Sequence, residues 1–306
     1  MLYGNFDVDY CSEVHHAKTL TALGHDVIRL QENRVSADVV LSESLNADML
    51  VWVHTHSFVN TGRPMDEVLV ELRRRHIPTV AYHLDLYMGL RRWREYQNSP
   101  YMKVQHFFTC DRLMAEWFNA NTDTTGHYLP AGVFEPECYL ATPGERFDVA
   151  FVGSKGYHSE WPYRPQLINW LADTYGDRFR HYGGGGRATV RGAELNQVYA
   201  DARVVVGDSL CLGYGYPDYW SDRVYETLGR GGFLIHPYVS GMERHFSDGK
   251  HLHFYAYNDF AELRHLIDYY LSYPDEADDI RRAGHEHVKA HHTYRDRWTE
   301  ILDAVA

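Results

Sequence analysis

Continuous apolar runs alternate with amphipathic segments along the first 134 residues. The runs carry apolar residues at successive positions, which is typical of parallel strands covered on both faces. The segments between them, such as 12–23 and 65–76, repeat apolar residues at the spacing of a helix face. We expect strands near Leu2–Tyr3 and at 26–30, 48–56, 77–85, 106–111 and 126–132. This alternation predicts a doubly wound parallel sheet.

Ser12 and Gly24 predict the ends of the first helix. A serine before the first apolar turn is suited to cap a helix, and a glycine after the last turn can take the left-handed conformation that ends one.

A second alternation follows a stretch of different composition. Residues 130–147 are rich in Pro, Gly and Glu and have no clear period, which predicts a linker. Beyond them we expect strands at 147–154, 179–183, 203–209, 233–236 and 253–258, and helices at 165–176, 193–202, 219–230 and over most of 259–305. The sequence thus predicts one domain over 1–134, with a terminal helix, 291–306, packing back on it, and a second over 145–290. Clefts between such domains bind ligands at the carboxyl ends of strands.

The helix predicted at 222–230 has an unusually charged face for a helix that leads directly into a buried strand. Arg223, Glu226 and Arg230 stand at i, i+3 and i+7, so they share that face. Ser221 is a suitable N-cap, and the first N–H groups, over 222–224, lack intrahelical partners and are expected to meet a phosphate. Arg223 adds a bidentate charge, and Glu226 suits a ribose diol. The alternative is a surface salt bridge between Glu226 and Arg230, worth under ~1 kcal/mol.

Two glycine-rich turns stand at predicted strand ends in the same half. In FVGSKG, Gly153 permits close approach of a ligand to the backbone, Ser154 offers a hydroxyl and Lys155 a point charge. The second turn, HYGGGG, contributes Tyr182 and Gly183. Neither turn matches GxxxxGK[ST] or GxGxxG, so a tight turn and a flexible loop remain the respective alternatives.

Composition and charge narrow the classes of partner. The 306 residues carry a net charge of −12, which argues against a nucleic-acid coat or a membrane-surface binder. Basic runs at 72–76 and 90–94 could still form a local patch, the alternative being a solvated helix face. The four cysteines lack CxxC spacing, so neither a disulfide framework nor a zinc knuckle is indicated. Without a signal-peptide pattern or an apolar stretch near ~20 residues, we expect a cytoplasmic protein.

Three segments of the second half carry a family resemblance: FDVAFVGS at 147–154, the Tyr182-Gly183 pair, and SDRVYETLGRGGFLI at 221–235. With them, the chain resembles GT-B glycosyltransferases, in particular the CgeB/YkvP-like family, related to glycosyltransferase family 4. The resemblance implies two Rossmann-like domains facing a cleft, the first on the acceptor side and the second binding the donor. It implies transfer of a hexosyl or pentosyl group from a nucleotide-diphosphate sugar to an acceptor hydroxyl, with no further cofactor.

The resemblance also implies roles for single residues. Glu226 matches the glutamate that holds the nucleotide ribose, and Arg223 and Lys155 match positions expected to meet the diphosphate. Gly153 and Ser154 match the turn on the phosphate side.

Asp218 is where the chain departs from the family pattern. Family 4 has a Glu-x7-Glu pattern whose first glutamate contacts the donor sugar, and counting back from Glu226 leads to Asp218. Asp218 is therefore a candidate donor contact, and an ordinary loop acid is the alternative.

Polar residues follow two predicted strands of the first half. His54, His56 and Ser57 end one strand, and His83 and Asp85 end the next. His83 and Asp85 are expected on one strand face and match the family's acceptor-side strand end, where they would orient or deprotonate an acceptor hydroxyl. For any single histidine, the alternative is a hydrogen-bonded packing residue.

Possible metal half-sites lack the ligands to complete them. The HTH run at 54–56, and His287 with His291, have no evident carboxylate or cysteine partner, and the DVD run at 7–9 lies in the half that by the resemblance does not bind the donor. We therefore predict no catalytic metal. Arg223, Lys155 and the helix N-terminus would stabilise the leaving diphosphate, with retention of anomeric configuration as the family implies.

Two alternative functions remain open. One is a nucleotide-sugar-binding or assembly protein that has the fold without turnover, which an assay of donor hydrolysis or transfer would separate from an enzyme. The other is a sugar transferase acting on modified DNA, which the acidic charge disfavours and a salt-sensitive DNA shift would support.

Overall fold

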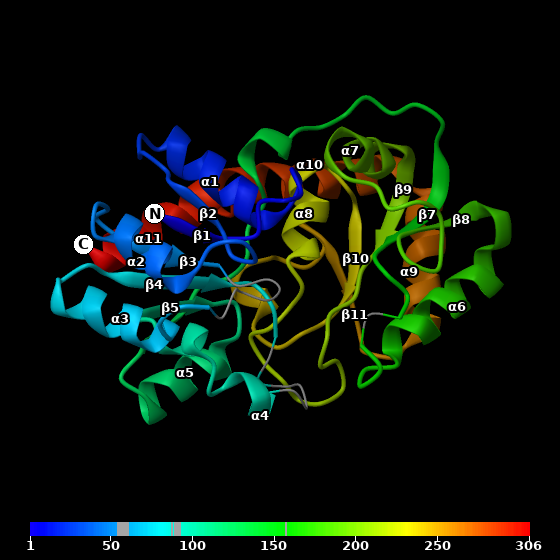
Figure 1. Cartoon of the computed structure of the whole chain (residues 1–306). Helices are drawn as coiled ribbons and strands as arrows, with labels where there is room; N and C mark the ends of the chain where they lie inside the picture. The colour runs from blue at the N-terminus through cyan, green and yellow to red at the C-terminus, as the bar shows by residue number, and fades with distance from the viewer. Residues whose placement is uncertain (54–60, 87, 89–92, 157) are drawn as a thin grey trace. The chain divides into compact units, whose positions relative to one another are not determined.

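The computed structural model describes residues 1–53, 61–86, 88, 93–156 and 158–306, coloured along the chain in Figure 1. These residues form two compact units, one made of residues 1–130 with 294–306 and the other of residues 131–293. Within the described residues, unit 1 holds a six-stranded sheet and unit 2 a five-stranded sheet. All neighbouring strands run parallel, which confirms the predicted α/β class with two doubly wound sheets.

The sheet of unit 1 has the strand order β2-β1-β3-β4-β5-β6. Its central strands are apolar on successive residues because helices cover both faces. All five residues of β4 are buried. The strands are β1 (Leu2–Gly4), β2 (Arg29–Gln31), β3 (Leu50–Trp52), β4 (Thr79–His83), β5 (His106–Thr109) and β6 (Thr125–Tyr128).

The helices of unit 1 are α1 (Ser12–Ala22), α2 (Ala37–Ser44), α3 (Met65–Arg74), α4 (Trp93–Tyr96), α5 (Arg112–Asn121), α11 (Tyr294–Val305) and the short 3₁₀ helix η1 (Pro100–Lys103). The cap predicted for the first helix is wrong, because Ser12 is its first residue and Cys11 precedes it without a side-chain cap. The predicted end is confirmed, since Gly24 lies just beyond α1 with φ 95°.

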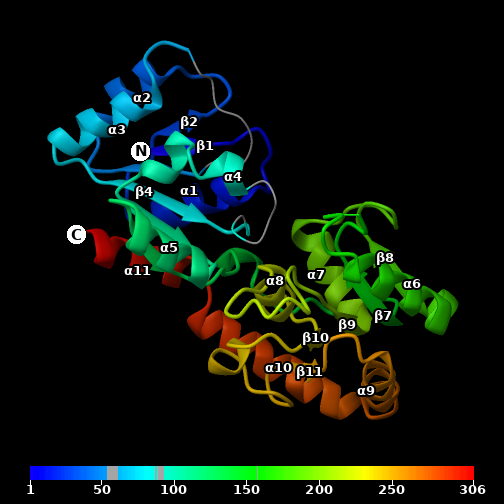
Figure 2. The ribbon, with the colours of Figure 1, turned by 90° about the horizontal axis from the view of Figure 1, so that it is seen from below.

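The sheet of unit 2 has the strand order β11-β10-β9-β7-β8. Its strands are β7 (Phe147–Val152), β8 (Phe179–Tyr182), β9 (Ala202–Val206), β10 (Leu234–Pro237) and β11 (His253–Tyr255). Its helices are α6 (Tyr163–Tyr175), α7 (Gly192–Asp201), α8 (Arg223–Gly229), α9 (Phe260–Ser272) and α10 (Pro274–His291), with short helices η2 (Glu135–Glu137), η3 (Gly176–Arg178) and η4 (Met242–Arg244). The long helix α10 packs along α8, as Figure 2 shows from below. No helix in the described part of the chain is both long enough and apolar enough to span a membrane.

The stretch predicted as a linker packs onto unit 2. Val133 and Cys138 are buried, and Val133 N donates to His292 O at 3.0 Å. The backbone carbonyls of Glu137 and Tyr139 accept hydrogen bonds from Asn196 Nδ2 at 2.9 and 3.1 Å. Residues 133–139 of the stretch predicted as a linker therefore pack on unit 2, because Val133 and Cys138 are buried and Asn196 binds two backbone carbonyls of this segment.

Helix α11 joins unit 1 although it follows unit 2 in the chain. It packs against α1, and Trp298 Nε1 donates to Nδ1 of the fully buried His16 at 3.2 Å. The imidazole also contacts the rings of Tyr82 and Tyr294, with centroids 5.4 and 4.6 Å away. An aromatic cluster around one neutral imidazole thus holds the last helix on the first unit.

His16 is expected to make the protein less stable in acid. Burial, with a smaller contribution from His15, lowers the pKa of His16 to about 3, whereas an unfolded histidine titrates near 6.5. The unfolded chain then binds the proton first, so the free energy of unfolding falls as the pH drops from about 6.5 towards 3. Denaturant unfolding at several pH values should show a smaller acid loss for His16→Phe than for the wild type. His25→Phe, at an exposed position, is the control and should match the wild type.

Candidate functional site

The carboxyl edge of the unit-2 sheet contains a point where neighbouring strands connect in opposite directions. β7 pairs with β8 on one side and with β9 on the other, so the chain leaves β7 towards one edge and returns past it to β9. Loops that diverge in this way leave a crevice beyond the strand ends, where open α/β sheets bind ligands. The candidate binding residues of the second half lie after β7, at the end of β8, and in the loop and helix that follow β9.

Gly153, the first residue after β7, brings the strand end against Arg223 of α8. Its φ is 149°, and a Cβ atom at this position would lie 2.8 Å from Arg223 Nη1, so only glycine leaves room for the guanidinium. Gly153 N donates to Tyr182 O at 2.8 Å, and a Cβ on Gly183 would lie 2.6 Å from Gly153 O. The structure thus brings Gly153, Tyr182, Gly183 and Arg223 together at the point where the connections diverge.

The first turn of α8 has N–H groups that are satisfied within the chain. Arg223 N donates to Ser221 Oγ at 3.3 Å, and Val224 N donates to Ser221 O at 3.1 Å. The prediction of unpartnered N–H groups over 222–224 is therefore wrong for these two residues, because Ser221 folds over the start of the helix. A ligand charge at this place would have to be met by side chains.

Arg223 and Glu226 are the charged groups that α8 presents at this edge. Loss of water opposes the charge on Arg223, but the carboxylates of Asp222 and Glu226 outweigh it and raise the pKa of the guanidinium. Loss of water and the nearby Asp222 raise the pKa of Glu226, against the pull of Arg230, Arg223 and Arg191. The Glu226 side chain is 32% exposed. Hydrogen-bond donors from a ligand would stabilise its charged form.

Arg230 belongs to the interior of unit 2 rather than to this site. Its side chain is 3% exposed and forms an ion pair with Glu137. Its Nη1 donates to Asn196 Oδ1 at 2.7 Å and to Gly192 O at 3.3 Å. The Glu226 carboxylate lies 3.8 Å from Arg230 Nη2, so the pair proposed as the alternative exists, but half of it is buried.

A buried ion pair that the sequence did not reveal joins the first turn of α6 to the loop after β9. Arg164 Nε donates to both carboxylate oxygens of Asp208, at 3.0 and 2.8 Å, and Arg164 Nη1 donates to Ser154 O at 3.2 Å. The two side chains are 8% and 3% exposed. They line a cavity of about 70 Å³ together with Lys155 and Ser209. The sequence signal was the position of Asp208, near the end of the strand predicted at 203–209.

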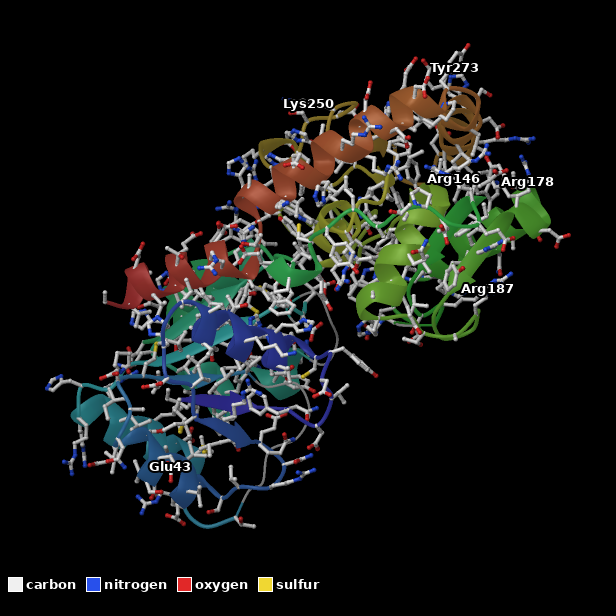
Figure 3. The ribbon with its side chains drawn as sticks, turned by 90° about the horizontal axis from the view of Figure 1, so that it is seen from above. Glu43, Arg146, Arg178, Arg187, Lys250 and Tyr273 are labelled. Atoms are coloured by element: carbon white, nitrogen blue, oxygen red, sulfur yellow. The ribbon has the colours of Figure 1, made fainter. Side chains whose placement is uncertain are left out.

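Lys155 and Ser154 lie at the rim of this region. Lys155 N donates to Gly184 O at 2.8 Å, while its ammonium donates to Asn169 Oδ1 at 2.6 Å on the exposed side of α6. Ser154 is exposed and uses its carbonyl to bind Arg164. Arg187, the residue after the glycine run, is exposed and lies at the outer edge of unit 2 (Figure 3).

Asp218 is bound to the turn that follows β10. Its backbone has φ 57°, its N–H donates to Ser240 O at 2.8 Å, and its carboxylate forms an ion pair with Arg244. The residue is 7% exposed. The carboxylate therefore has a partner within the protein, which agrees with the alternative of a structural loop acid.

In unit 1, His83 and Asp85, which were predicted at the end of the acceptor-side strand, lie in different surroundings. His83 is buried, with Nδ1 3.2 Å from Tyr101 OH and its ring against Phe107. Asp85 is exposed. The prediction that they share a strand face is wrong, because β4 ends at His83 and the alternation stops there. His54, His56 and Ser57 lie outside the described residues.

Of the two basic runs, 72–76 lies within the described residues and 90–94 lies mostly outside them. In 72–76, Arg75 Nε and Arg74 Nη1 lie 2.9 and 3.9 Å from carboxylate oxygens of Glu71, with all three on the surface of α3, as expected for a solvated helix face.

The histidines considered as metal ligands make other contacts. His287 Nε2 donates to His245 O at 2.7 Å, and its ring stacks on His251 with centroids 4.1 Å apart. In the DVD run, Asp7 forms an ion pair with Arg34 at 2.7 Å. Over the residues that the structure describes, no group of three or more His, Cys, Asp or Glu side chains is arranged to hold a metal ion.

The sequence model of a family described as glycosyl transferase-like matches residues 143–303, which is more than half of the chain. The chain belongs to this family. The match covers every strand of unit 2 and the helices from α6 to α10, including the edge that holds Arg223 and Gly153. The sequence has no match among curated proteins.

Solved glycosyltransferases share the fold of this glycosyl transferase-like chain. Anabaena Alr3699/HepE in complex with UDP and glucose has a TM-score of 0.65 at 12% identity, covering 99% of this chain and 98% of that one. An alpha-glucosyltransferase in complex with UDP and a 13-mer DNA containing a central A:G mismatch gives the same four values. A glycosyltransferase from Rickettsia africae ESF-5 has a TM-score of 0.61 at 12% identity, covering 99% and 97%. The GT-B fold predicted for the chain is thereby confirmed.

Proposed function

We propose that the chain transfers a sugar from a nucleoside-diphosphate donor to an acceptor hydroxyl. The observation that carries the proposal is the guanidinium of Arg223, held against Gly153 at the diverging strand connections of unit 2. A fixed cation beside a glycine turn is the arrangement that a diphosphate requires, because the turn lets the phosphate oxygens approach the backbone. Family membership and the UDP bound in related folds support a sugar nucleotide as the ligand.

The donor is proposed to lie across the ends of β7 and β9. Arg223 and Lys155 would bind the diphosphate, with Gly153 and Ser154 forming the turn around it, and Glu226 would accept hydrogen bonds from the ribose hydroxyls. Two hydroxyl donors would stabilise the Glu226 carboxylate, whose pKa its surroundings raise. UDP is the first nucleotide to test, since related folds bind it.

The proposed reaction breaks the bond between the sugar C1 and the diphosphate oxygen and forms one between C1 and the acceptor oxygen, which loses its proton. We propose that the positive charges of Arg223 and Lys155 stabilise the leaving diphosphate without a divalent metal, and that the anomeric configuration is retained, by analogy with glycosyltransferase family 4. On the acceptor side Asp85, which is exposed, is better placed to meet a hydroxyl than the buried His83. The transferred group is proposed to be a hexosyl or pentosyl group.

Glu226→Ala is expected to weaken the binding of free UDP by about 1–3 kcal/mol, the usual cost of removing a charged hydrogen-bond partner. Isothermal titration calorimetry measures this directly. Glu194→Ala, at an exposed position in the first turn of α7, is the control and should bind UDP as the wild type does. Equal affinities for wild type and Glu226→Ala would contradict the proposal that Glu226 binds the ribose hydroxyls.

A transferase that acts on modified DNA is the second candidate. One observation favours it: an alpha-glucosyltransferase of similar fold forms a complex with UDP and DNA. The net charge of −12 opposes it, and Arg74 and Arg75 of the first basic run both lie near the Glu71 carboxylate, which offsets their positive charge. A DNA mobility shift that weakens steeply with salt would support this candidate. A protein that binds UDP but neither hydrolyses nor transfers from any UDP-sugar would instead be a binding protein of the same fold.

A further inference from the structure

A chain of hydrogen bonds runs from the end of β10 to the backbone of Arg223. His236 Nδ1 lies 2.7 Å from Pro237 O, and His236 Nε2 lies 3.2 Å from Ser209 Oγ. Ser221 N lies 3.0 Å from the same Ser209 Oγ, and Arg223 N lies 3.3 Å from Ser221 Oγ. This relay crosses from β10 through the loop after β9 to the start of α8.

The direction of each hydrogen bond in the relay follows from the groups it joins. A carbonyl oxygen only accepts, so His236 Nδ1 carries its hydrogen, and in the neutral imidazole Nε2 must accept from the Ser209 hydroxyl. The N–H of Ser221 donates to Ser209 Oγ, so this one hydroxyl both donates and accepts. Burial lowers the pKa of His236, which keeps the imidazole neutral. Replacing His236 by a side chain that cannot accept would leave the buried Ser209 hydroxyl without an acceptor.

His236 has no contact with solvent. Its exposed fraction is 0%, and a Cβ atom on Gly207 would lie 2.9 Å from its Cδ2, so the ring packs directly against the backbone of the loop after β9. A ligand at the edge of the sheet therefore cannot reach the imidazole. The hydrogen bonds through Ser209 and Ser221 connect the imidazole to the backbone of Arg223, and His236 and Arg223 also line one cavity of about 10 Å³.

The start of α8 depends on this relay. Asp222 occupies the N-cap position without a side-chain cap, and the helix has seven residues. The loop before it is irregular, with positive φ at four of its described residues: Cys211, Gly213, Gly215 and Asp218. The short helix and irregular loop provide little regular backbone bonding at this point, so the hydroxyls of Ser209 and Ser221 fix where the helix begins.

We propose that His236 is a positioning residue that, through Ser209 and Ser221, fixes the backbone of Arg223 and so directs its guanidinium at the donor diphosphate. The inference rests on the proposed function for the identity of the ligand, but the relay itself is a property of the protein without ligand. Arg223 is the residue that contacts the ligand, and His236 acts only through it.

Two amide substitutions test the two ring nitrogens of His236 separately. In His236→Gln the amide reaches the position of Nε2 and can accept from Ser209, whereas in His236→Asn it reaches only the position of Nδ1 and can bind Pro237 O. Calorimetry should show UDP affinity within about threefold of wild type for His236→Gln and at least about tenfold weaker for His236→Asn. Equal affinities of the two variants would overturn the proposal.

Ser209→Ala tests the relay if His236→Asn does not fold. It should weaken UDP binding as much as His236→Asn, and the double variant should bind no more weakly than either single one, since both break the same chain. Ser44→Ala is the matched control: Ser44 is fully buried in unit 1 and donates to Val40 O at 2.6 Å, so UDP affinity should stay unchanged. A Ser209→Ala protein that binds UDP like the wild type would overturn the proposal.

The route through Arg223 is tested in an Arg223→Ala background. There, His236→Asn should cause no further loss of UDP affinity, and a further loss equal to that in the wild type would contradict the route. Amide hydrogen exchange of residues 219–228 gives a readout without ligand. His236→Asn should accelerate exchange there and His236→Gln should not, and equal exchange in both would overturn the relay. If the wild type binds no nucleoside diphosphate, the proposed function fails, and hydrogen exchange still decides the relay.

Discussion

Arg223→Ala is expected to lower turnover with a UDP-sugar by about 10²–10³-fold while weakening UDP binding much less. A departing diphosphate gains negative charge as its bond to the sugar breaks, so a fixed cation stabilises the transition state more than the bound donor. Arg223 supplies that cation. Gly153 leaves room for its guanidinium, and the carboxylates of Asp222 and Glu226 keep the guanidinium charged. Steady-state rates and UDP calorimetry on the same preparation measure the two effects separately.

Three controls test whether the turnover depends on the charge of Arg223, on the planar shape of its guanidinium, or on a bound metal. Arg223→Lys keeps the charge without the planar fork and should recover part of the turnover. Arg187→Ala removes an exposed arginine at the edge of the same unit and should leave turnover unchanged. Activity should survive EDTA. A requirement for magnesium or manganese that added ion restores would show that a metal, rather than Arg223, carries the charge of the leaving group.

Asp208→Ala is expected to destabilise unit 2 by about 3–5 kcal/mol, because it leaves the buried guanidinium of Arg164 without its counter-ion. Arg164 donates to both oxygens of Asp208 and to Ser154 O, so the unpaired guanidinium would lie against the turn after β7. Thermal and denaturant unfolding give the change in stability. The loss should be larger than for an exposed ion pair, which contributes about 0–1 kcal/mol.

The matched control for Asp208 is Asp148, whose carboxylate is less buried and pairs with an exposed arginine. It lies 3.2 Å from Arg178 Nη1 and is 20% exposed, with the arginine 57% exposed, so Asp148→Ala should cost under about 1 kcal/mol. A double variant with Arg164→Leu and Asp208→Leu removes both charges and should recover much of the stability lost in Asp208→Ala. If Asp148→Ala and Asp208→Ala destabilise the protein equally, the buried pair has no special role.

The fold was predictable where the apolar positions in the local sequence are the positions that are buried in the structure. The continuous apolar run before His83 predicted β4, and the apolar spacing from Met65 predicted α3. Helices α2, α4 and α5 were not predicted. For α5 a signal existed, since Asp111 caps it by accepting from Met114 N, and Met114, Ala115 and Phe118 form its buried face. The stretch after Pro130 was assigned to a linker because composition does not show which side chains bind its backbone.

The candidate site was predictable where its residues belong to a short pattern that is visible in the local sequence. A glycine at a strand end and a charged first turn in the helix that follows β9 were both visible, and the structure brings Gly153 and Arg223 into contact. Contacts between distant residues were not visible. Arg164 and Asp208 are 44 positions apart, and Asp218 and Arg244 are 26 apart, so nothing in the local pattern of either pair indicates the partner. The relay through His236 was missed for the same reason, since a buried histidine in an apolar strand resembles any core residue.

The placement of α11 has a consequence for how the protein is made. Trp298 stands 282 positions after His16, its hydrogen-bond partner, and all of unit 2 lies between them. At the usual speed of translation, about 5–20 residues per second, the ribosome needs roughly 14–56 s to make that stretch. During this time the nascent unit 1 has no Trp298 or Tyr294 to cover the imidazole of His16, while every residue of unit 2 is made before α11. The unit that the ribosome begins first is therefore the last that it completes.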